Sequence, residues 1–157
     1  MENVDRIIHH PLFRSSMKKI REYEENREFC CHGIEHSLDV ARMAYIDNLE
    51  QNLGFSKEII YAAALLHDIG RWQQYAENIP HEEAGAALAS AILKETTFNA
   101  AEIQQILEAI GNHREKQTEA FSQLLYQADK QSRVCWLCGA QEACYWPDEK
   151  KNRTIRD

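Results

Sequence analysis

Apolar side chains recur along most of this chain at the spacing of an α-helix, with polar side chains between them. Leu38, Ala41 and Tyr45 fall on one face of such a segment, because helical side chains three or four positions apart point the same way. Gly54 lies just past the segment, at a position where glycine commonly ends a helix. The pattern therefore predicts an amphipathic helix over residues 34–52.

Start and stop signals predict further helices on both sides of this one. Pro11 is well tolerated in a first helical turn, and Ser56 can cap the start of a later helix. Asn99, followed three residues later by Glu102, matches the capping box that opens many helices. The predicted helices cover residues 11–26, 34–52, 56–67, 72–77, 81–94, 99–111 and 119–133.

The predicted fold class is all-α, because no segment shows the strict alternation of a β-strand. A chain of 157 residues is long enough for one hydrophobic core but too short for two ordinary domains. We expect a compact single-domain helical bundle over residues 1–134, with residues 135–157 as a cysteine-containing extension packed on the same domain. No apolar run reaches the ~20 residues that span a membrane, and no signal-peptide pattern opens the chain. A cytoplasmic location is therefore expected.

The net charge of −7 argues against a partner such as a nucleic acid polymer, whose phosphates need a basic surface. The charge is uneven along the chain. Residues 1–129 hold 12 basic and 21 acidic side chains, whereas residues 130–157 hold 6 and 4. A solvated basic tail explains this difference more simply than a docking patch does.

Histidine and aspartate side chains recur where the predicted helices begin or end. His36 lies near the start of one helix, and the doublet His67-Asp68 ends an apolar run that stops at Gly70. Asp129 lies inside the last predicted helix. Ionisable groups beside an apolar run need partners, and neutral imidazole and carboxylate are ligands for divalent transition metals. Four such residues in this order indicate a metal site.

The order His, His-Asp, Asp resembles the signature of the HD-domain metal-dependent phosphohydrolases, and the likeness covers roughly residues 20–135. The resemblance implies an HD-type helical domain in which His36, His67, Asp68 and Asp129 bind one divalent ion. Two further histidines are similar to the extra pair in the two-metal branch of that superfamily. By this resemblance Asp68 bridges two ions, and the second is held by His81 and His113.

The resemblance implies a reaction in which metal-activated water attacks phosphorus. The expected substrate is a small phosphorylated metabolite, such as a nucleotide ester or anhydride. Asp68, Arg71 and Lys130 are the candidate catalytic residues, and Arg71, Arg114 and Lys130 are the candidate phosphate ligands. Some family members place a glutamate at the position of Arg71. Nitrogen and oxygen ligands suit one or two ions of Fe, Mn, Co, Ni or Zn.

Two alternatives remain open at this point. Parts of the same superfamily resemble this ligand set but use a di-iron centre to activate dioxygen, which would make the protein an oxidoreductase. A protein with the same fold and metal could also bind a ligand without turnover. The sequence does not fix the substrate or the oligomeric state, because pocket shape sets the first and no specificity motif is present.

The five cysteines of this chain suggest a separate site. Cys135, Cys138 and Cys144 are one thiolate short of a tetrahedral zinc site. Residues 30–32 (Cys-Cys-His) could supply the fourth ligand, and Cys30 is the favoured candidate. A redox role for the Cys-x-x-Cys pair is less favoured, because no βαβ pattern surrounds it.

Spacing relative to the proposed ligands supports that choice. Cys30 lies six residues before His36, and Cys135 lies six residues after Asp129. If the two ligands meet and their helices run antiparallel, both cysteines leave the site on the same side. The alternative is an apolar cap in which reduced cysteines serve as small core residues beside Trp136, Leu137, Tyr145 and Trp146.

Three histidines outside the ligand set receive simpler interpretations. His32 lies four residues before His36, so it could contact substrate, although a role at the start of the helix is favoured. His9 and His10 precede Pro11 in a segment that looks exposed, and we assign them no function.

Overall fold

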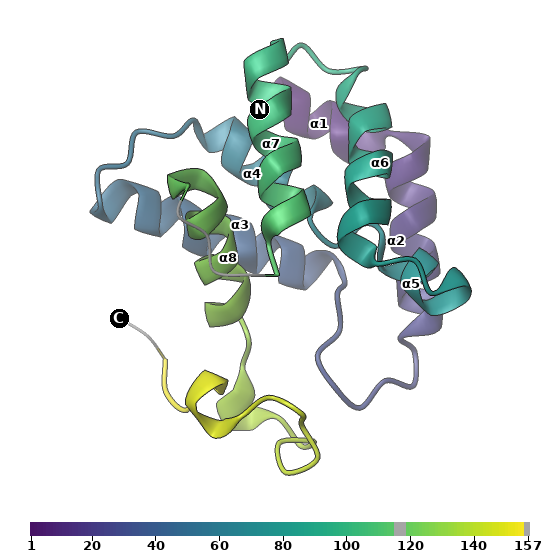
Figure 1. The fold of residues 1–157 in the computed structure, drawn as a ribbon, viewed down its shortest axis with the longest axis vertical. Helices are drawn as coiled ribbons and strands as arrows, with labels where there is room; N and C mark the ends of the chain where they lie inside the picture. The colour runs from purple at the N-terminus through teal and green to yellow at the C-terminus, as the bar shows by residue number, and fades with distance from the viewer. Residues whose placement is uncertain (115–118, 156–157) are drawn as a thin grey trace.

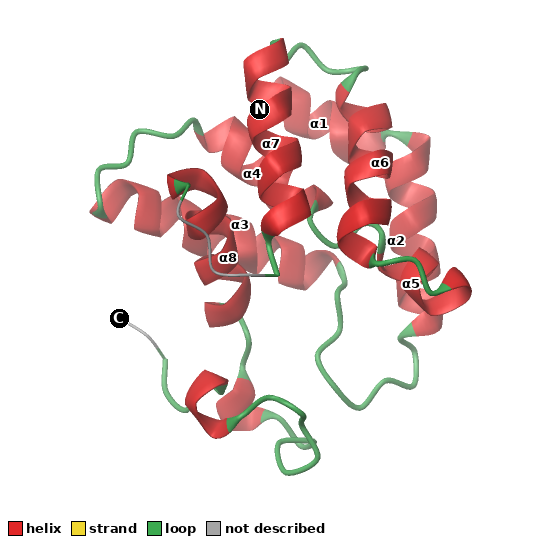
Figure 2. Ribbon diagram, viewed as in Figure 1, coloured by secondary structure: helices red, strands yellow, loops and turns green. Residues whose placement is uncertain are grey.

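The computed structural model describes residues 1–114 and 119–155 of the chain. Within this part the regular structure is helical and contains no strand, so the predicted all-α class is confirmed (Figures 1 and 2). The α-helices are α1 (Glu2–His9), α2 (Pro11–Tyr23), α3 (Ile34–Glu50), α4 (Lys57–Leu66), α5 (Arg71–Glu77), α6 (His81–Leu93), α7 (Ala100–Asn112) and α8 (Ala120–Gln131).

Helix α4 lies at the centre of the bundle. Its residues from Ile59 to Leu66 are buried apart from Tyr61, and it packs against α1, α3, α7 and α8. Burying a large aliphatic side chain contributes roughly 1.5–3 kcal/mol, so this apolar helix supplies much of the core. The doublet His67-Asp68 follows it directly. The most buried helix thus delivers two of the proposed metal ligands into the interior.

Helix α1 is the one α-helix of the described chain that the sequence reading missed. Val4 and Ile7 are buried at helical spacing, and α1 packs on α4. The backbone N–H of Asn3 donates to Oε1 of Glu58 at 2.7 Å, which fixes α1 to the first turn of α4. The apolar spacing was the available signal, but the segment is only eight residues long and Pro11 follows it closely.

The predicted helix boundaries are otherwise correct to within a few residues. The capping box of Asn99 and Glu102 forms as expected. Ser56 stands at the N-cap of α4 but makes no side-chain capping bond. The helix predicted for residues 11–26 ends at Tyr23, since the chain turns there into a long loop that leads to α3.

The C-terminal extension differs from the rest of the chain. Residues 135–155 contain only two short 3₁₀ turns, η1 (Cys135–Leu137) and η2 (Asp148–Lys150). The extension lies beyond the end of α8, on the side toward which the α2–α3 loop also reaches (Figure 1). The Nδ2 group of Asn152 contacts the carbonyl oxygens of Lys130, Gln131 and Arg133, which satisfies groups that the end of a helix leaves free.

The alternative interpretation, an apolar cap over the cysteines, is contradicted for three of the four residues named for it, while Trp146 is half-buried. Trp136, Leu137 and Tyr145 are exposed by 45%, 74% and 83%, so their apolar surfaces do not pack into a core. Of the large apolar and cysteine side chains in residues 135–155, only Cys135 is buried. Something other than hydrophobic burial must therefore hold this segment together.

No helix within the described residues is long and apolar enough to cross a membrane.

Candidate metal centre

All six predicted ligands meet in the interior of the bundle, and their side chains are buried. Each lies at a helix end or on a helix face that points inward, so rigid elements fix its position. They are His36 in the first turn of α3, His67 at the C-cap of α4, Asp68 just after it, His81 at the start of α6, His113 at the C-cap of α7 and Asp129 inside α8.

The first ligand group consists of His36, His67, Asp68 and Asp129, each offering one atom within 4.8 Å of the others. Nε2 of His36 lies 3.2 Å from Oδ1 of Asp129 and 3.6 Å from Oδ2 of Asp68. Nε2 of His67 lies 3.0 Å from the same Oδ2. Two imidazoles and two carboxylates therefore converge on one point from α3, α4 and α8.

The second ligand group consists of Asp68, His81 and His113, also within 4.8 Å of one another. Nε2 of His81 lies 3.4 Å from Oδ1 of Asp68, and Nε2 of His113 lies 3.7 Å from that oxygen. The two histidine nitrogens face each other at 3.0 Å. Asp68 thus turns one carboxylate oxygen to each group.

The histidine rings are held so that Nε2 is the atom offered to each group. Nδ1 of His67 lies 2.7 Å from the carbonyl oxygen of Ala64, and Nδ1 of His113 lies 2.6 Å from that of Ile110. A carbonyl oxygen can only accept, so both Nδ1 atoms carry protons and each ring turns its Nε2 toward the ligand group.

The other two rings are held by side chains. Oε1 of Gln74 lies 2.9 Å from Nδ1 of His81, and Oγ of Ser132 lies 3.3 Å from Nδ1 of His36. Neither Gln74 nor Ser132 was predicted as part of the site. Both lie on elements that already carry a named residue, Gln74 on α5 after Arg71 and Ser132 just after α8.

A close contact between glycines brings the two groups together. A Cβ atom built on Gly70 would lie 2.4 Å from the backbone nitrogen of Gly85 and 2.4 Å from the carbonyl oxygen of His81. Atoms cannot approach that closely, so only glycine lets the turn after Asp68 touch the start of α6. This contact places His81 beside Asp68.

The carboxylates and His67 form a strongly coupled buried cluster. Burial opposes ionisation of Asp68 and Asp129, but facing histidines and cations outweigh it and hold both pKa values well below the ordinary range. Burial likewise lowers the pKa of His67, yet Asp68 and Asp129 raise it to about 10. Burial and the charge of Arg71 lower the pKa of His81 to about 2.

The donor set fits a divalent ion of the nitrogen- and oxygen-binding class. Nε2 of His67 and Oδ2 of Asp68 are buried 3.0 Å apart, yet within the described residues neither makes a well-aligned hydrogen bond. Buried polar atoms without partners are rare in proteins and cost roughly 1–3 kcal/mol each. A cation held between them would remove that cost. The predicted metal site is thus supported by the structure, whereas the identity of the ion is left open by the ligand types.

Three cationic side chains contact the carboxylates of the site. Nε of Arg71 donates to Oδ1 of Asp68 at 2.9 Å, and Nζ of Lys130 donates to Oδ2 of Asp129 at 2.5 Å. Nη2 of Arg133 donates to Oδ1 of Asp129 at 3.1 Å. The predicted residues Arg71 and Lys130 are therefore beside the ligands, and Arg133 is an addition that sequence reasoning missed.

The position of Arg133 could have been inferred from helical spacing. It lies four residues after Asp129, so a continuation of the helix places both side chains on one face. Nη2 of Arg133 lies 2.9 Å from Nε2 of His36, and its Nη1 donates to the carbonyl oxygen of Cys31 at 3.3 Å. Arg114, in contrast, forms an ion pair with Glu82 and is 54% exposed.

His32 belongs to a separate buried network next to the site. Its backbone N–H donates to Oε2 of Glu24 at 2.6 Å, and its ring contacts Oε1 of the same carboxylate. The hydroxyl of Tyr75 donates to that Oε1 at 2.6 Å. Burial lowers the pKa of His32 to about 4, so the ring is neutral at ordinary pH. The network fixes the loop that leads into α3.

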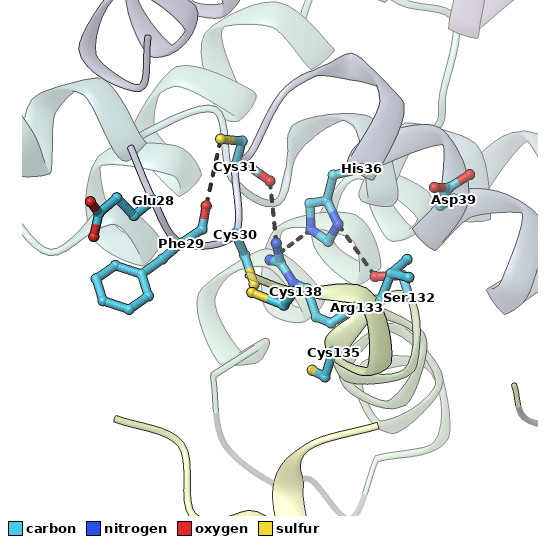
Figure 3. Close-up of a pocket in the computed structure, with 11 residues that line it drawn as sticks. Glu28, Phe29, Cys30, Cys31, His36, Asp39, Ser132, Arg133, Cys135 and Cys138 are labelled. Carbon is cyan, nitrogen blue, oxygen red and sulfur yellow. Dashed lines mark hydrogen bonds between the residues drawn. The ribbon is translucent and has the colours of Figure 1, made fainter. Parts of the chain in front are cut away.

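A cavity of about 260 Å³ opens beside the first ligand group. Figure 3 shows His36, Arg133 and Ser132 on one side of it and Cys30 with Cys138 on another. The imidazole of His36 and the guanidinium of Arg133 are joined by a dashed line there. Of the first ligand group, only His36 lines this cavity.

Comparison with known proteins agrees with this picture. The family model described as HD domain matches residues 33–140. An uncharacterized protein of Clostridium beijerinckii is 47% identical over 139 residues, which make up 88% of each chain.

The fold is also similar to a crystal structure described as a predicted HD superfamily hydrolase from an uncultured Thermotogales bacterium. The TM-score is 0.64 at 24% sequence identity, and the match covers 96% of this chain and 87% of that one. At this identity the likeness concerns the fold.

Proposed function

The chain belongs to the HD domain family, and on that premise we propose that it is a metal-dependent phosphohydrolase of a small phosphorylated metabolite, such as a nucleotide. The observation that carries the proposal is the position of Asp68. Its Oδ2 faces His36 and His67, whereas its Oδ1 faces His81 and His113. A carboxylate shared in this way is suited to a pair of divalent ions.

The six ligands would hold two ions of Fe, Mn, Co, Ni or Zn, the first by His36, His67, Asp68 and Asp129, the second by Asp68, His81 and His113. Such ions supply Lewis acidity toward a phosphoryl oxygen and lower the pKa of bound water toward neutrality. No side-chain nucleophile is then required. The Nδ1 contacts of the histidines keep Nε2 directed at the ions.

The cations beside the ligands supply the charge that a phosphate requires. Arg71, Lys130 and Arg133 each contact a ligand carboxylate, so positive charge gathers at the site despite the overall charge of −7. A guanidinium fork matches the geometry of phosphate oxygens. We assign phosphate binding to Arg71 and Lys130, and add Arg133 because it also lines the cavity.

The size of the cavity supports a small substrate. Pockets for drug-sized ligands measure roughly 300–1,000 Å³, and the cavity beside His36 measures about 260 Å³. A space of this size admits a phosphate and part of the group attached to it.

The test is hydrolysis without oxygen. Protein purified anaerobically and loaded with Mn²⁺ is incubated with a panel of nucleoside mono-, di- and triphosphates and p-nitrophenyl phosphate, and released phosphate and product are measured. We expect turnover of at least one substrate under these conditions. His36→Ala should reduce the rate by roughly 100-fold or more, because removing a ligand costs at least as much as disturbing its supporting contacts.

The matched control is His9→Ala, since His9 is an exposed histidine on α1 far along the chain from the ligands. This variant should retain the wild-type rate. Product formed only in the presence of dioxygen would overturn the proposal in favour of the oxidoreductase alternative. Tight binding of a phosphorylated ligand without any turnover would indicate a non-catalytic HD protein instead.

A further inference from the structure

The C-terminal extension is ordered without a hydrophobic core of its own. Its large apolar side chains Trp136, Leu137 and Tyr145 are exposed, and its longest regular element is a single 3₁₀ turn. A segment this short cannot bury enough apolar surface to offset the entropy of ordering its backbone. Natural segments of this kind are commonly held by disulfides or by a structural metal.

The extension contributes three cysteines, and the α2–α3 loop brings a fourth to them. Cys30, Cys135 and Cys138 line the same cavity, and Figure 3 shows the side chains of Cys30 and Cys138 beside each other. Burial raises the pKa of Cys30, and the neighbouring thiols of Cys135, Cys138 and Cys144 raise it further. Cys30, Cys135 and Cys138 therefore gather around one cavity, and Cys144 lies in the same short segment as the last two.

We propose that Cys30, Cys135, Cys138 and Cys144 bind a structural zinc ion that joins the extension to the α2–α3 loop. The Cys-x-x-Cys pair forms a turn in which the N–H of Cys138 donates to the carbonyl oxygen of Cys135 at 3.2 Å. This turn offers two thiols from one short segment, as zinc sites of this spacing do. Cys144 follows in the same segment, and Cys30 completes a tetrahedral set.

Binding requires the thiols to lose their protons. Four thiols and one Zn²⁺ give a four-thiolate complex with a charge of minus two and release four protons to solvent. Two arginines lie where they can offset that charge. Nε of Arg27 donates to the carbonyl oxygen of Cys30 at 2.9 Å, and Arg133 lowers the pKa of the Cys30 thiol.

The ion would draw the sulfurs together. Among the described residues, the groups with potential ligand atoms within 4.8 Å of one another contain no cysteine. In a tetrahedral site with Zn–S distances of about 2.3 Å, the sulfurs lie about 3.8 Å apart. The proposal therefore requires a small closure of the extension onto the loop. Most residues of the segment 135–155 are exposed, so few buried contacts resist such a closure.

The position of this site links it to the proposed catalytic centre. Arg133 donates to the carbonyl oxygen of Cys31 and to Asp129, and it precedes Cys135 by two residues. A zinc ion at the four cysteines would thus fix both chain segments that position Arg133. The site itself stands independently of the proposed activity, because its ligands are all distinct from the six in the interior.

The test is cobalt binding to the full chain under anaerobic, reducing conditions. Metal-free wild-type protein is titrated with Co²⁺, and we expect a thiolate-to-cobalt charge-transfer band in the near ultraviolet whose final intensity corresponds to one thiolate-bound ion per chain, beside the ions that the interior ligands take up without such a band. Cys138→Ser should weaken this band strongly. Cys31→Ser is the matched control, since Cys31 is exposed and outside the set, and it should leave the band unchanged. His113→Ala should also leave it unchanged.

A second measurement on the wild-type protein avoids any loss of folding in a variant. Zinc-loaded and chelator-treated samples are alkylated, and the modified cysteines are identified by mass spectrometry. We expect zinc to protect the four cysteines while Cys31 reacts in both samples. Equal alkylation of all five cysteines with and without zinc would overturn the proposal. So would a Cys30–Cys138 disulfide in freshly purified protein or a cobalt spectrum without a thiolate band.

Discussion

The two ligand groups in the interior share Asp68 but differ in charge and in support. In the first group, two carboxylates, Asp68 and Asp129, lie opposite two histidines. The second group offers one shared carboxylate to His81 and His113, and Arg71 already donates to the oxygen that faces them. Lys130 and Arg133 likewise donate to Asp129 of the first group, so the advantage of that group lies in its fourth ligand, a second carboxylate. We expect the first ion to bind more tightly than the second.

The two groups also differ in what holds them in place. His36, His67 and Asp129 come from helices of the central bundle, where α3 packs on both α4 and α8. His81 depends on the close contact between Gly70 and Gly85. Both groups are carried by packed helices, since α6 packs on α7, but the second also needs this one backbone contact to bring His81 to Asp68. The second should therefore be the easier to lose.

The largest effect is expected from Asp68→Asn, because it alters the one residue that both groups share. The amide carries no negative charge, so both ions should be lost or greatly weakened, and hydrolysis should fall by roughly 100-fold or more. Metal content per chain after dialysis measures the first effect. Asp5→Asn, at an exposed position on α1, is the control and should keep both ions. Retention of two ions by Asp68→Asn would contradict the shared role.

Gly70→Ala should distinguish the two ligand groups, because only the second depends on this glycine. The added Cβ would lie 2.4 Å from backbone atoms of Gly85 and His81, so α6 must move, at a cost of about 1–3 kcal/mol in the free energy of unfolding. We expect the second ion to be lost and the first to remain. Metal content and urea unfolding measure the two effects.

Gly111→Ala is the matched control for that variant. Gly111 lies inside α7, and a Cβ atom there meets nothing within 4 Å. The free energy of unfolding should rise by about 0.4–1 kcal/mol, since alanine restricts the unfolded chain. If Gly70→Ala kept both ions, the contact would not be what positions His81.

Smaller effects, each on a different ion, are expected from the two side chains that contact the histidine rings. Ser132→Ala removes the partner of His36 in the first group, whereas Gln74→Ala removes the partner of His81 in the second. Each substitution should lower the binding affinity of one ion only. We expect a loss of about 10-fold for Ser132→Ala, because the contact of Ser132 is the longer, and of up to roughly 100-fold for Gln74→Ala. Stepwise Mn²⁺ titration of the two variants distinguishes the ions. A loss of the same step in both would contradict the division into two groups.

A further effect concerns acid stability next to the first group. The pKa of His32 is lowered to about 4 by burial, whereas histidine ordinarily titrates at 6.5. Between these values only the unfolded chain binds the proton, so the metal-free protein should lose up to roughly 3 kcal/mol of stability as the pH falls from 6.5 to 4. Urea unfolding across this interval should show a shallower decline in His32→Gln. If the free energy of unfolding fell equally with pH in the wild type and in His32→Gln, His32 would not be held neutral in the folded protein.

The sequence was most informative where chemistry and helical spacing coincide. The ligands could be predicted because ionisable residues stand at the ends of apolar helices, and all six converge. Ser132 was missed because its role depends on the three-dimensional approach of α8 to His36, whereas the spacing of Arg133 from Asp129 was a signal that the sequence did offer. The Gly70–Gly85 contact was also beyond prediction, since it joins two backbones that the sequence alone does not place side by side. The apolar residues of the C-terminal extension suggested a packed cap that does not form around Trp136, Leu137 and Tyr145, because composition does not specify which side chains are covered.

The most direct test of the shared Asp68 is electron paramagnetic resonance of the protein loaded with Mn²⁺. Two ions bridged by one carboxylate are exchange-coupled, so the wild type should show the spectrum of a coupled pair. His113→Ala should convert it to the hyperfine pattern of an isolated ion while the first group stays filled. An isolated-ion spectrum from the fully loaded wild type would contradict the two-ion centre.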